Sequence, residues 1–369
     1  MIKDALRDII EGGTLSRDRA RSVMEEIMTG GATGAQFGAL VTALRMRGET
    51  DEEIAGFAEV LRDKSLRVPL PESCEIVDCC GTGGDGSGSF NISTAAAIVA
   101  AAAGAKLAKH GNRSASSQCG SADVLEGLGV RIEATPEQVA RCVTEIGIGF
   151  MYAPAFHPAM RFAGPPRREI GIRTVFNLLG PLTNPARAQA QLIGVPERAL
   201  VERLGRSIGL MGTRHALLVH GLEGLDEVSI CGPTLVCEVR GGDQSHLAPH
   251  LDPRPAPHLA PHLDTYEVTP EQFGLTRGTA ADIVGGSVED NVRIITDLFD
   301  GADGPRQGVV LLNAAAVLYI ARIAPTWADG IALAREALAS GAARRKLAAL
   351  VALTQSFAAA TAPTLAAAT

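Results

Sequence analysis

Residues 78–123 combine glycines, hydroxyls, amides and charged groups in a pattern that could hold a phosphorylated substrate. Ile76 and Val77 predict the end of a short buried strand, and five glycines follow within residues 81–88. Glycine adopts a positive φ easily and lets the backbone approach a ligand closely. Ser93 and Thr94 stand where helix caps belong, just before the apolar run of residues 95–103. A glycine loop followed by a helix N-terminus presents free N–H groups and a positive dipole end to an anion. The stretch therefore predicts a phosphate site.

The loop does not match the two common nucleotide-binding patterns. Its glycines miss the G-x-G-x-x-G spacing, and no Gly-Lys-Ser/Thr ends it. Asp85 inside the loop would repel a phosphate unless it met a sugar hydroxyl, a metal ion or a lysine. This favours a phosphorylated sugar bound with a metal ion over plain ATP. A glycine-rich surface turn is the alternative, and a single glycine loop is more often that.

A second polar cluster follows a short strand predicted at residues 105–108. Lys109, His110, Asn112 and Arg113 place two permanent cations, an imidazole and an amide within one short stretch. Four serines follow as donors to phosphate oxygens: Ser114, Ser116, Ser117 and Ser121. In open α/β sheets, ligands bind at the C-terminal ends of the strands. A solvated loop is the alternative, but two glycine-rich polar loops after consecutive strands favour a site.

Two later segments add candidate residues. A strand predicted at residues 146–152 precedes His157 and Arg167, which could form a pocket wall or equally a surface turn with arginines in water. Another strand, predicted at residues 214–220, precedes Asp226 and Glu227. Mg²⁺ takes one or two carboxylates together with substrate phosphate oxygens. Most acidic pairs are solvated surface, so this pair predicts a magnesium site only in combination with the phosphate loop.

The composition predicts an α/β fold and excludes some classes of function. Of the 369 residues, 46% are hydrophobic but only 4% aromatic, which is typical of small aliphatic helices packed on a parallel sheet. A net charge of −7 and a pI of about 5.7 argue against general nucleic-acid binding. Seven cysteines without zinc spacing predict free thiols in a reducing cytoplasm. No apolar stretch reaches the length that would cross a membrane.

The pattern along the chain predicts two domains. Residues 1–70 predict only helices, with capping-box signatures that begin at Thr33 and Thr50, and apolar helix faces there favour a dimer. Residues 71–357 predict a large domain of strands, loops and helices, with residues 178–185 as a hinge segment. Residues 244–264 contain a His- and Pro-rich duplication and predict a flexible insertion. Residues 358–369 are of low complexity and predict a disordered tail.

Three segments together resemble one family: GTGGDGSGSFNIST, KHGNRSASSQCGSADVLEGLG and HPAMRFAGPPRREIGIRTVFNLLGPLTNP. They are similar to the anthranilate phosphoribosyltransferase family of tryptophan biosynthesis. The resemblance implies an α/β fold of the nucleoside phosphorylase and phosphoribosyltransferase type. It also implies a homodimer formed through the helical domain, and a segment near residues 165–190 that returns to that domain. The implied reaction transfers the phosphoribosyl group of 5-phosphoribosyl-1-pyrophosphate (PRPP) to the amino group of anthranilate, with Mg²⁺ as cofactor and pyrophosphate released.

The resemblance and the two loops give three predicted sets of site residues. The PRPP set is Gly81, Gly84, Asp85, Ser89, Asn91, Ile92, Ser93, Thr94, Lys109, His110, Gly111, Asn112, Arg113, Ser117 and Ser121. The anthranilate set is Gly81, Asn112, Arg167, His110 and His157. The magnesium set is Ser93, Asp226 and Glu227. No acid or base is assigned, because the aniline nitrogen is already nucleophilic.

Two other functions fit the same fold class. One is a pyrimidine nucleoside phosphorylase-like enzyme, against which the acidic pair and the Arg167 segment argue. The other is a non-catalytic nucleic-acid-binding relative, against which the acidic pI argues. The expected partners are therefore PRPP, anthranilate and a second copy of the chain, with neither nucleic acid nor membrane.

Overall fold

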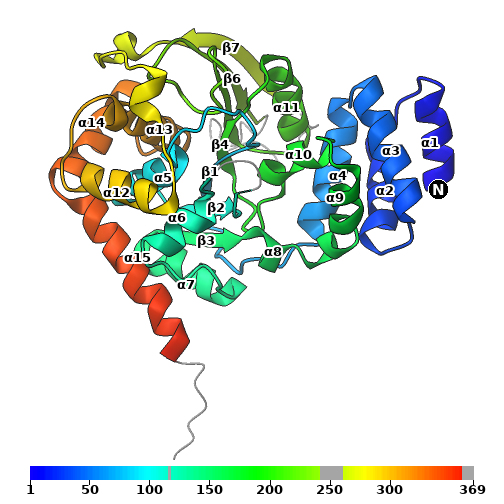
Figure 1. Ribbon diagram of the computed structural model, residues 1–369, viewed down its shortest axis with the longest axis horizontal. Coiled ribbons are helices and arrows are strands. Elements are labelled where there is room, and N and C mark those ends of the chain that lie inside the picture. Colours follow the sequence, from blue (N-terminus) through cyan, green and yellow to red (C-terminus); the bar gives the residue numbers. More distant parts are fainter. Residues whose placement is uncertain (115–117, 242–260, 360–369) are drawn as a thin grey trace, which may run out of the picture.

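The computed structural model describes residues 1–114, 118–241 and 261–359, and the chain divides into two parts (Figure 1). A bundle of N-terminal helices lies at one end, and a seven-stranded sheet covered by helices forms the rest. This confirms the predicted fold class, a small helical domain followed by a large α/β domain with a mainly parallel sheet. Among the described residues, no helix has the length and hydropathy needed to span a membrane.

Side-chain caps set the starts of three of the four helices in the small domain. The helices are α1 Ile2–Ile10, α2 Arg17–Met28, α3 Gly34–Arg47 and α4 Asp51–Asp63. Ser16 caps α2, and the capping boxes predicted at Thr33 and Thr50 are both present. In each box the threonine hydroxyl accepts a hydrogen bond from a backbone N–H that the helix leaves unpaired. The apolar faces of the four helices share one hydrophobic cluster.

A later segment packs on these helices and connects them to the sheet. Its elements are α8 Ala153–Phe156, η1 Pro158–Arg161, α9 Gly164–Ile170, α10 Phe176–Leu179 and η2 Gly180–Thr183. The ring of Phe176 lies 5.2 Å from that of Phe37 in α3, and Leu179 and Leu182 join the same cluster. Residues 178–185, predicted as a hinge segment, form the end of α10 and then η2 and are mostly buried.

The sheet has the strand order β3-β2-β1-β4-β5-β6-β7. The five strands from β3 to β5 in this order run parallel to one another. β6 pairs antiparallel with β5, and β7 pairs antiparallel with β6. Their bounds are β1 Val77–Gly81, β2 Leu107–Gly111, β3 Ile148–Tyr152, β4 Ala190–Gly194, β5 His215–Gly221, β6 Thr234–Arg240 and β7 His262–Val268. From β1 the chain adds β2 and β3 on one side and then β4 and β5 on the other, so the direction of strand order reverses between β1 and β4. In open α/β sheets, ligands bind beyond the carboxyl ends of the strands at such a switch point.

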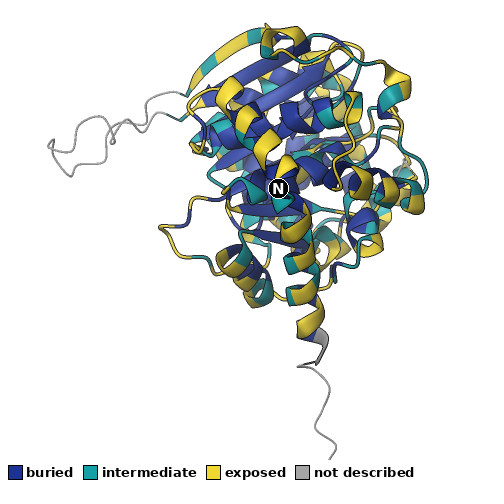
Figure 2. Ribbon diagram, turned by 90° about the vertical axis from the view of Figure 1, so that its left-hand side faces the viewer, coloured by how far each residue is buried: buried dark blue, intermediate teal, exposed yellow. Residues whose placement is uncertain are grey.

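Helices cover both faces of the sheet, so most strands are buried and only the edge strand β7 is largely exposed (Figure 2). Successive side chains of β5 face opposite sides of the sheet. Leu217 and Val219 belong to the cluster under α5 (Ile92–Ala102) and α13 (Pro305–Ile320), whereas Ala216 and Leu218 belong to the cluster under α11 (Arg198–Leu210). The remaining helices are α5 Ile92–Ala102, α6 Ser121–Gly127, α7 Pro136–Ile146, α11 Arg198–Leu210, η3 Pro270–Phe273, η4 Ala280–Ile283, α12 Val288–Phe299, α13 Pro305–Ile320, α14 Trp327–Ala339 and α15 Ala342–Ala359.

Several predicted bounds near the glycine loop were wrong. β1 begins at Val77, where the strand was predicted to end, because Cys79 and Cys80 continue the parallel ladder with β4. Asn91, rather than Ser93 or Thr94, precedes α5, and no side chain caps that helix. The two hydroxyls are instead inside the first turn.

Two predictions near the ends of elements also need correction. β7 begins at His262, so the last three residues of the predicted insertion 244–264 are strand, because they pair with β6. α15 continues to Ala359, two residues into the predicted tail 358–369. The rest of both segments lies almost entirely outside the described residues. No disulfide joins the seven cysteines, all of which are in the described part.

We expect Gly56→Ala to destabilise the protein, because α4 approaches α2 closely at this residue. A Cβ on Gly56 would lie 2.6 Å from the carbonyl oxygen of Arg17 and 2.9 Å from the Cβ of Ala20. The resulting backbone shift should cost about 1 to 3 kcal/mol in the free energy of unfolding. Gly38→Ala in α3 is the control: its nearest neighbour would be 3.6 Å away, and it should stabilise the helix by about 0.5 to 1 kcal/mol. Urea unfolding compares them; equal effects would contradict this packing argument.

Candidate active site

The glycine loop after β1 and the acidic pair after β5 meet at the switch point of the sheet. Gly83 N donates to Asp226 Oδ2 at 3.1 Å, and Asp226 N approaches Asp85 Oδ2 at 3.5 Å. Gly81 has to be glycine here, because a Cβ would lie 2.5 Å from the same Asp226 oxygen. A Cβ on Gly194, at the end of β4, would likewise meet the Asp226 backbone. Sequence reasoning did not single out Gly194, since its need for glycine comes from a residue in another loop.

The loop itself depends on glycine and on an arginine from the returning segment. Gly83, Gly84, Gly86 and Gly88 all have φ between 64° and 80°, a region that other residues rarely adopt. Arg173 Nη2 donates to the Gly83 carbonyl at 3.0 Å, and its guanidinium fills the space where Gly84 would otherwise carry a Cβ. Sequence reasoning missed Arg173, although it lies in the third motif.

Lys109 and Glu227 meet through Ser93 in the first turn of α5. Lys109 Nζ donates to Ser93 Oγ at 3.3 Å and to the carbonyl of Cys79. Ser93 N donates to Glu227 Oε1 at 3.1 Å. Lys109 is only 3% exposed, so its ammonium is held among these groups rather than in solvent. Three segments that are far apart in the sequence are therefore joined at the carboxyl end of β1.

Negative charge is concentrated at this point. Burial raises the pKa of Glu227 to about 7, although Lys109 opposes the shift. Burial raises the pKa of Asp226 as well, and the charges of Asp85 and Glu227 add to this. Raised carboxyl pKa values show that the chain alone does not neutralise the cluster. A divalent cation would.

The donor chemistry of this cluster fits Mg²⁺, which prefers carboxylate and other hard oxygen ligands. No group of three or more metal-type side chains is arranged around one point in the part of the chain that the structure describes. Mg²⁺ usually takes only one or two protein carboxylates and completes its shell with water and substrate phosphate. Asp226 and Glu227 are the residues that could hold it, with Ser93 beside them.

A buried carboxylate holds the strands under the loop together. Asp78 is fully buried; its Oδ1 accepts hydrogen bonds from His110 N at 3.2 Å and Cys79 N at 2.8 Å. Its Oδ2 accepts from Asn184 Nδ2 at 2.7 Å, and the same amide donates to the Ala108 carbonyl at 2.9 Å. Asp78 thus joins β1, β2 and the residues after η2. Sequence reasoning gave it no role, because its partners come from two other segments.

His110, in β2, and His157, directly after α8, form a buried pair. Their Nε2 atoms are 3.2 Å apart, and their ring centroids are 5.0 Å apart. Burial lowers the pKa of His110 to about 4 and that of His157 to about 3. Hydrogen bonds to the backbone of Gly180 and Leu61 only partly oppose these shifts. Both rings are therefore neutral at pH 7.

Arg167 is a half-buried cation without a counter-ion among the described residues. Its guanidinium lies 5.2 Å from the centroid of the Phe176 ring, a cation–π geometry. Burial lowers the pKa of Arg167, with no opposing carboxylate. No hydrogen bond or ion pair within residues 1–114, 118–241 and 261–359 joins it to the glycine loop. An anionic group is what this arginine lacks.

Three buried oxygens at the junction of the loop and α5 have no hydrogen-bond partner among the described residues. They are Thr82 Oγ1, Asn91 Oδ1 and Thr94 Oγ1. Asn91 also donates through Nδ2 to the Cys119 carbonyl at 3.1 Å. Unpaired buried polar atoms are uncommon in proteins, so these three, from the glycine loop and the start of α5, are available to a ligand. Thr82 is the member that sequence reasoning missed.

The remaining predicted residues differ in how they are placed. Arg113 donates to Asp123 and Glu126, each at 2.9 Å, so its charge is already paired. Ser121 packs against Gly111 and donates to the Asn112 carbonyl at 3.3 Å. The Ile92 side chain is buried, Ser89 N bonds to Ser87 Oγ, and Ser117 lies outside the described residues.

The histidine pair should make stability depend on pH. An unfolded histidine takes up a proton near pH 6.5, whereas the buried rings do so only near pH 3 to 4. The unfolded state therefore binds more protons below pH 6.5, and the free energy of unfolding falls as the pH decreases. His157→Gln should remove the contribution of one histidine to this decrease in the free energy of unfolding. Relative to wild type, the variant should gain on the order of 2 kcal/mol between pH 7 and pH 5.

Urea unfolding at the two pH values measures this difference. The exposed His262 gives the control His262→Gln, which should track wild type. If His157→Gln differed from wild type by the same amount at pH 5 and pH 7, the pair would not be held neutral by burial.

Comparison with known proteins places this geometry in a family. The helical bundle domain of a glycosyl transferase family matches residues 3–65, and the a/b domain of a glycosyl transferase family matches residues 73–344. The anthranilate phosphoribosyltransferase of Herpetosiphon aurantiacus is 52% identical over 94% of this chain and 97% of its own length. The enzyme of Chloroflexus aurantiacus is 51% identical over 96% and 99%.

Solved structures agree with the curated relatives. The crystal structure of anthranilate phosphoribosyltransferase from Thermus thermophilus superposes with a TM-score of 0.85 at 40% identity, covering 95% of this chain and 99% of that one. The Saccharomyces cerevisiae enzyme in complex with PRPP and Mg superposes with a TM-score of 0.83 at 27% identity, covering 96% and 98%. From the two family domains, the near-complete relatives and the shared fold, the chain belongs to the anthranilate phosphoribosyltransferase family.

Proposed function

We propose that this chain transfers the phosphoribosyl group of PRPP to the amino group of anthranilate, releasing pyrophosphate and forming N-(5-phosphoribosyl)anthranilate in tryptophan biosynthesis. The observation that carries the proposal is the meeting of the glycine loop, Lys109 and the acidic pair Asp226–Glu227 at the switch point of the sheet. The named relatives support it, and they include a yeast enzyme in complex with PRPP and Mg. They favour this function over the phosphorylase and nucleic-acid-binding alternatives.

The glycine loop and Lys109 suit the pyrophosphate half of PRPP. C1 of the ribose passes through an oxocarbenium-like state as its bond to pyrophosphate breaks, so negative charge grows on the leaving group. Backbone N–H groups of the loop and the buried ammonium of Lys109 can stabilise that charge without reorganising. Asp226 and Glu227 would hold Mg²⁺, which when bound neutralises pyrophosphate oxygens. The unpaired oxygens of Asn91 and Thr94 are available to the ribose hydroxyls.

Arg167 and the histidine pair suit the acceptor. A guanidinium matches the planar carboxylate of anthranilate, and Arg167 has no counter-ion of its own among the described residues. The neutral His110 and His157 present ring faces and no charge that would compete for that carboxylate. The aniline nitrogen needs no strong base, so alignment of the nitrogen with C1 supplies much of the rate.

The acceptor assignment is tested by steady-state fluorescence turnover of anthranilate with PRPP and Mg²⁺. Arg167→Ala should raise the KM for anthranilate about tenfold or more, the cost of losing a charge-assisted hydrogen bond, and leave the KM for PRPP nearly unchanged. The adjacent, exposed Arg168 gives the control Arg168→Ala, which should behave as wild type. Wild-type protein that binds PRPP but turns over no anthranilate would overturn the acceptor.

The metal assignment uses the same assay with a magnesium titration. Asp226→Asn and Glu227→Gln should each raise the Mg²⁺ concentration needed for half-maximal turnover, because each removes a negative oxygen ligand. Glu223→Gln, at an exposed glutamate of the same loop, should leave that concentration unchanged. If the three variants and wild type all reached half-maximal turnover at the same Mg²⁺ concentration, Asp226 and Glu227 would not be the ligands.

We also propose that the helical domain mediates a homodimer. The support is a set of exposed apolar side chains on α1 and α3: Ile10 is 70% exposed, and Met46 is 85% exposed. Burying these side chains against a second copy of the chain would remove apolar surface from water. Light scattering after size exclusion should give twice the chain mass for wild type, and Ile10→Glu with Met46→Glu should shift it toward one chain mass. A monomeric wild type would contradict the proposal.

A further inference from the structure

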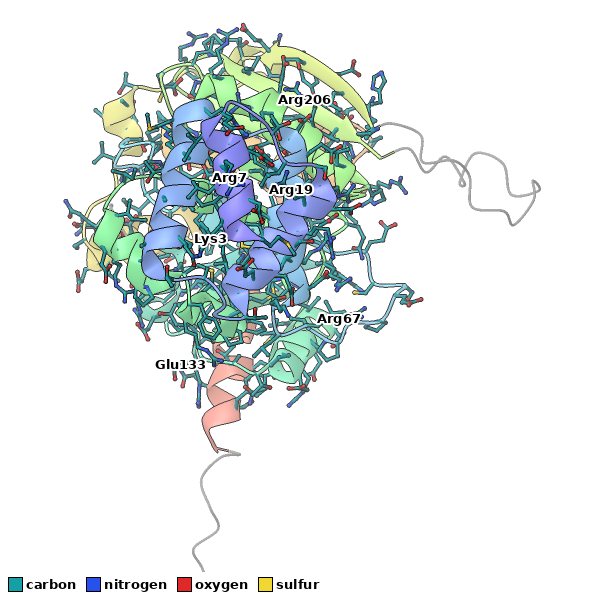
Figure 3. All side chains as sticks on the ribbon, turned by 90° about the vertical axis from the view of Figure 1, so that its right-hand side faces the viewer. Lys3, Arg7, Arg19, Arg67, Glu133 and Arg206 are labelled. Atoms are coloured by element: carbon teal, nitrogen blue, oxygen red, sulfur yellow. The ribbon has the colours of Figure 1, made fainter. Side chains whose placement is uncertain are left out.

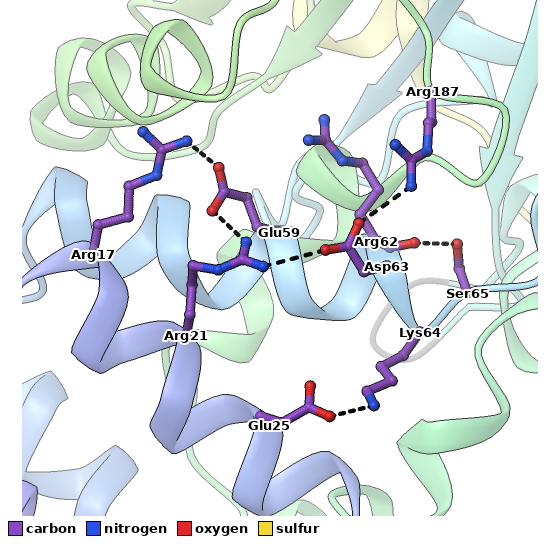
Figure 4. Close-up of polar contacts among 9 residues, drawn as sticks. All are labelled: Arg17, Arg21, Glu25, Glu59, Arg62, Asp63, Lys64, Ser65 and Arg187. Carbon is purple, nitrogen blue, oxygen red and sulfur yellow. Dashed lines mark hydrogen bonds and ion pairs between the residues drawn. The ribbon is translucent and has the colours of Figure 1, made fainter.

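Four arginines gather where α2 and α4 meet the turn that leads into β4. They are Arg17 and Arg21 from α2, Arg62 from the last turn of α4, and Arg187 from the turn; we call them the arginine cluster (Figure 4). The cluster lies apart from the glycine loop and the acidic pair, because Arg187 precedes the start of β4 whereas these lie at the ends of β1 and β4. It comes nearest to the histidine pair through the backbone of Leu61, which bonds to His157.

The carboxylates near the cluster pair with only three of its arginines. Glu59 accepts from both Arg17 and Arg21, the latter at 2.6 Å. Asp63 is 3.4 Å from Arg21 and 3.2 Å from Arg187. Figure 4 shows these pairs as dashed lines, together with Lys64, whose charge is paired with Glu25. Four guanidinium groups thus share two carboxylates, which leaves local positive charge on a chain of net charge −7.

Arg62 is the unpaired member. Its guanidinium makes no hydrogen bond or ion pair with any residue in the described ranges, and its Nε is buried without a partner. Burial lowers the pKa of Arg62, and the charge of Arg187 lowers it further, although the charges of Asp63 and Glu59 oppose the shift. The C-terminal end of α4 attracts a cation, but it offers no acceptor to Nε. An unpaired, partly desolvated guanidinium lacks an anion.

The backbone at Arg187 is a second, independent observation. Its φ is 54°, a left-handed conformation that is uncommon outside glycine. Arg187 N bonds to the Asn184 carbonyl at 3.0 Å, so the turn is tight. Non-glycine residues are kept in such conformations where the surroundings require the side chain in one place. Here the conformation brings the guanidinium beside Asp63 and close enough to Arg62 to oppose its charge.

We propose that the arginine cluster binds a small oxyanion such as inorganic phosphate, with Arg62 as its principal ligand and Arg187 as the second. Guanidinium groups donate pairs of parallel N–H bonds that match phosphate and sulfate oxygens. A bound anion would satisfy Arg62 and link the end of α4 to the turn before β4. It would therefore stabilise the packing of the helical domain on the α/β domain. The ligand is either free phosphate or pyrophosphate, which share this chemistry.

The test measures thermal unfolding and calorimetric binding with the full chain at constant ionic strength, with chloride replaced stepwise by phosphate. The candidate active site also attracts phosphate, so the informative quantity is the part of the response that depends on Arg62. Arg62→Met removes the charge and keeps an apolar stem. Arg206→Met, at an exposed arginine of α11 (Figure 3), is the matched control, and Arg187→Gln is a second cluster variant. Pyrophosphate replaces phosphate in a parallel titration.

We expect phosphate to raise the melting temperature of wild type and of Arg206→Met by the same increment. Arg62→Met should be at least as stable as wild type without phosphate, because it removes an unpaired charge. It should then fall below wild type as phosphate increases, with one fewer bound anion per chain, and Arg187→Gln should weaken the response. A loss seen only in the pyrophosphate titration would assign pyrophosphate as the ligand. Identical anion responses of Arg62→Met and wild type would overturn the proposal.

Discussion

The arrangement of the site depends on one buried carboxylate. Asp78 accepts hydrogen bonds from the backbone of β1 and β2 and from the side chain of Asn184. A fully buried carboxylate with fewer partners would be costly, so these three contacts must form together when the chain folds. The strands that carry the glycine loop and Lys109 are in this way held in register with the segment that returns from the helical domain. Asp78 thus fixes the position of the glycine loop and Lys109 relative to the returning segment.

Charge imbalance marks the functional surfaces. The structure places Asp85, Asp226 and Glu227 together, with Lys109 and Arg173 near them. Among the described residues, no carboxylate forms an ion pair with Arg167 or Arg62. By contrast, Arg47 in the small domain bonds to the buried Glu53. Unpaired charge lowers stability in the isolated chain, and the cation, phosphate and carboxylate ligands proposed above would each compensate it.

Close contacts of the backbone at three glycines also shape the candidate site. Gly81 and Gly194, at the ends of neighbouring strands, both lie against Asp226, and Gly84 lies against Arg173. Any side chain at these positions would push the acidic pair or the arginine away from the loop. Glycine at these positions therefore keeps the acidic pair and the arginine against the loop, whose backbone N–H groups can approach a phosphate.

Local features of the structure follow from the sequence alone. The capping boxes at Thr33 and Thr50, the alternation of strands and helices, and the need for glycine in the loop after β1 depend on neighbouring residues. The three motifs likewise identified the family, because they are contiguous stretches. Element ends were less predictable: β1 continues past Val77 only because β4 lies beside it.

The tertiary structure alone decided which distant residues meet. It brought Asp226 to Gly83 across 143 residues, gave Asp78 its partner Asn184 across 106 residues, and added Arg173 and Thr82 to the site. It also showed that Arg113 is already paired and that Arg62 is not. The reason is physical: a residue's propensity acts through its neighbours in the chain, whereas charge pairing and desolvation depend on distances that only the folded chain sets.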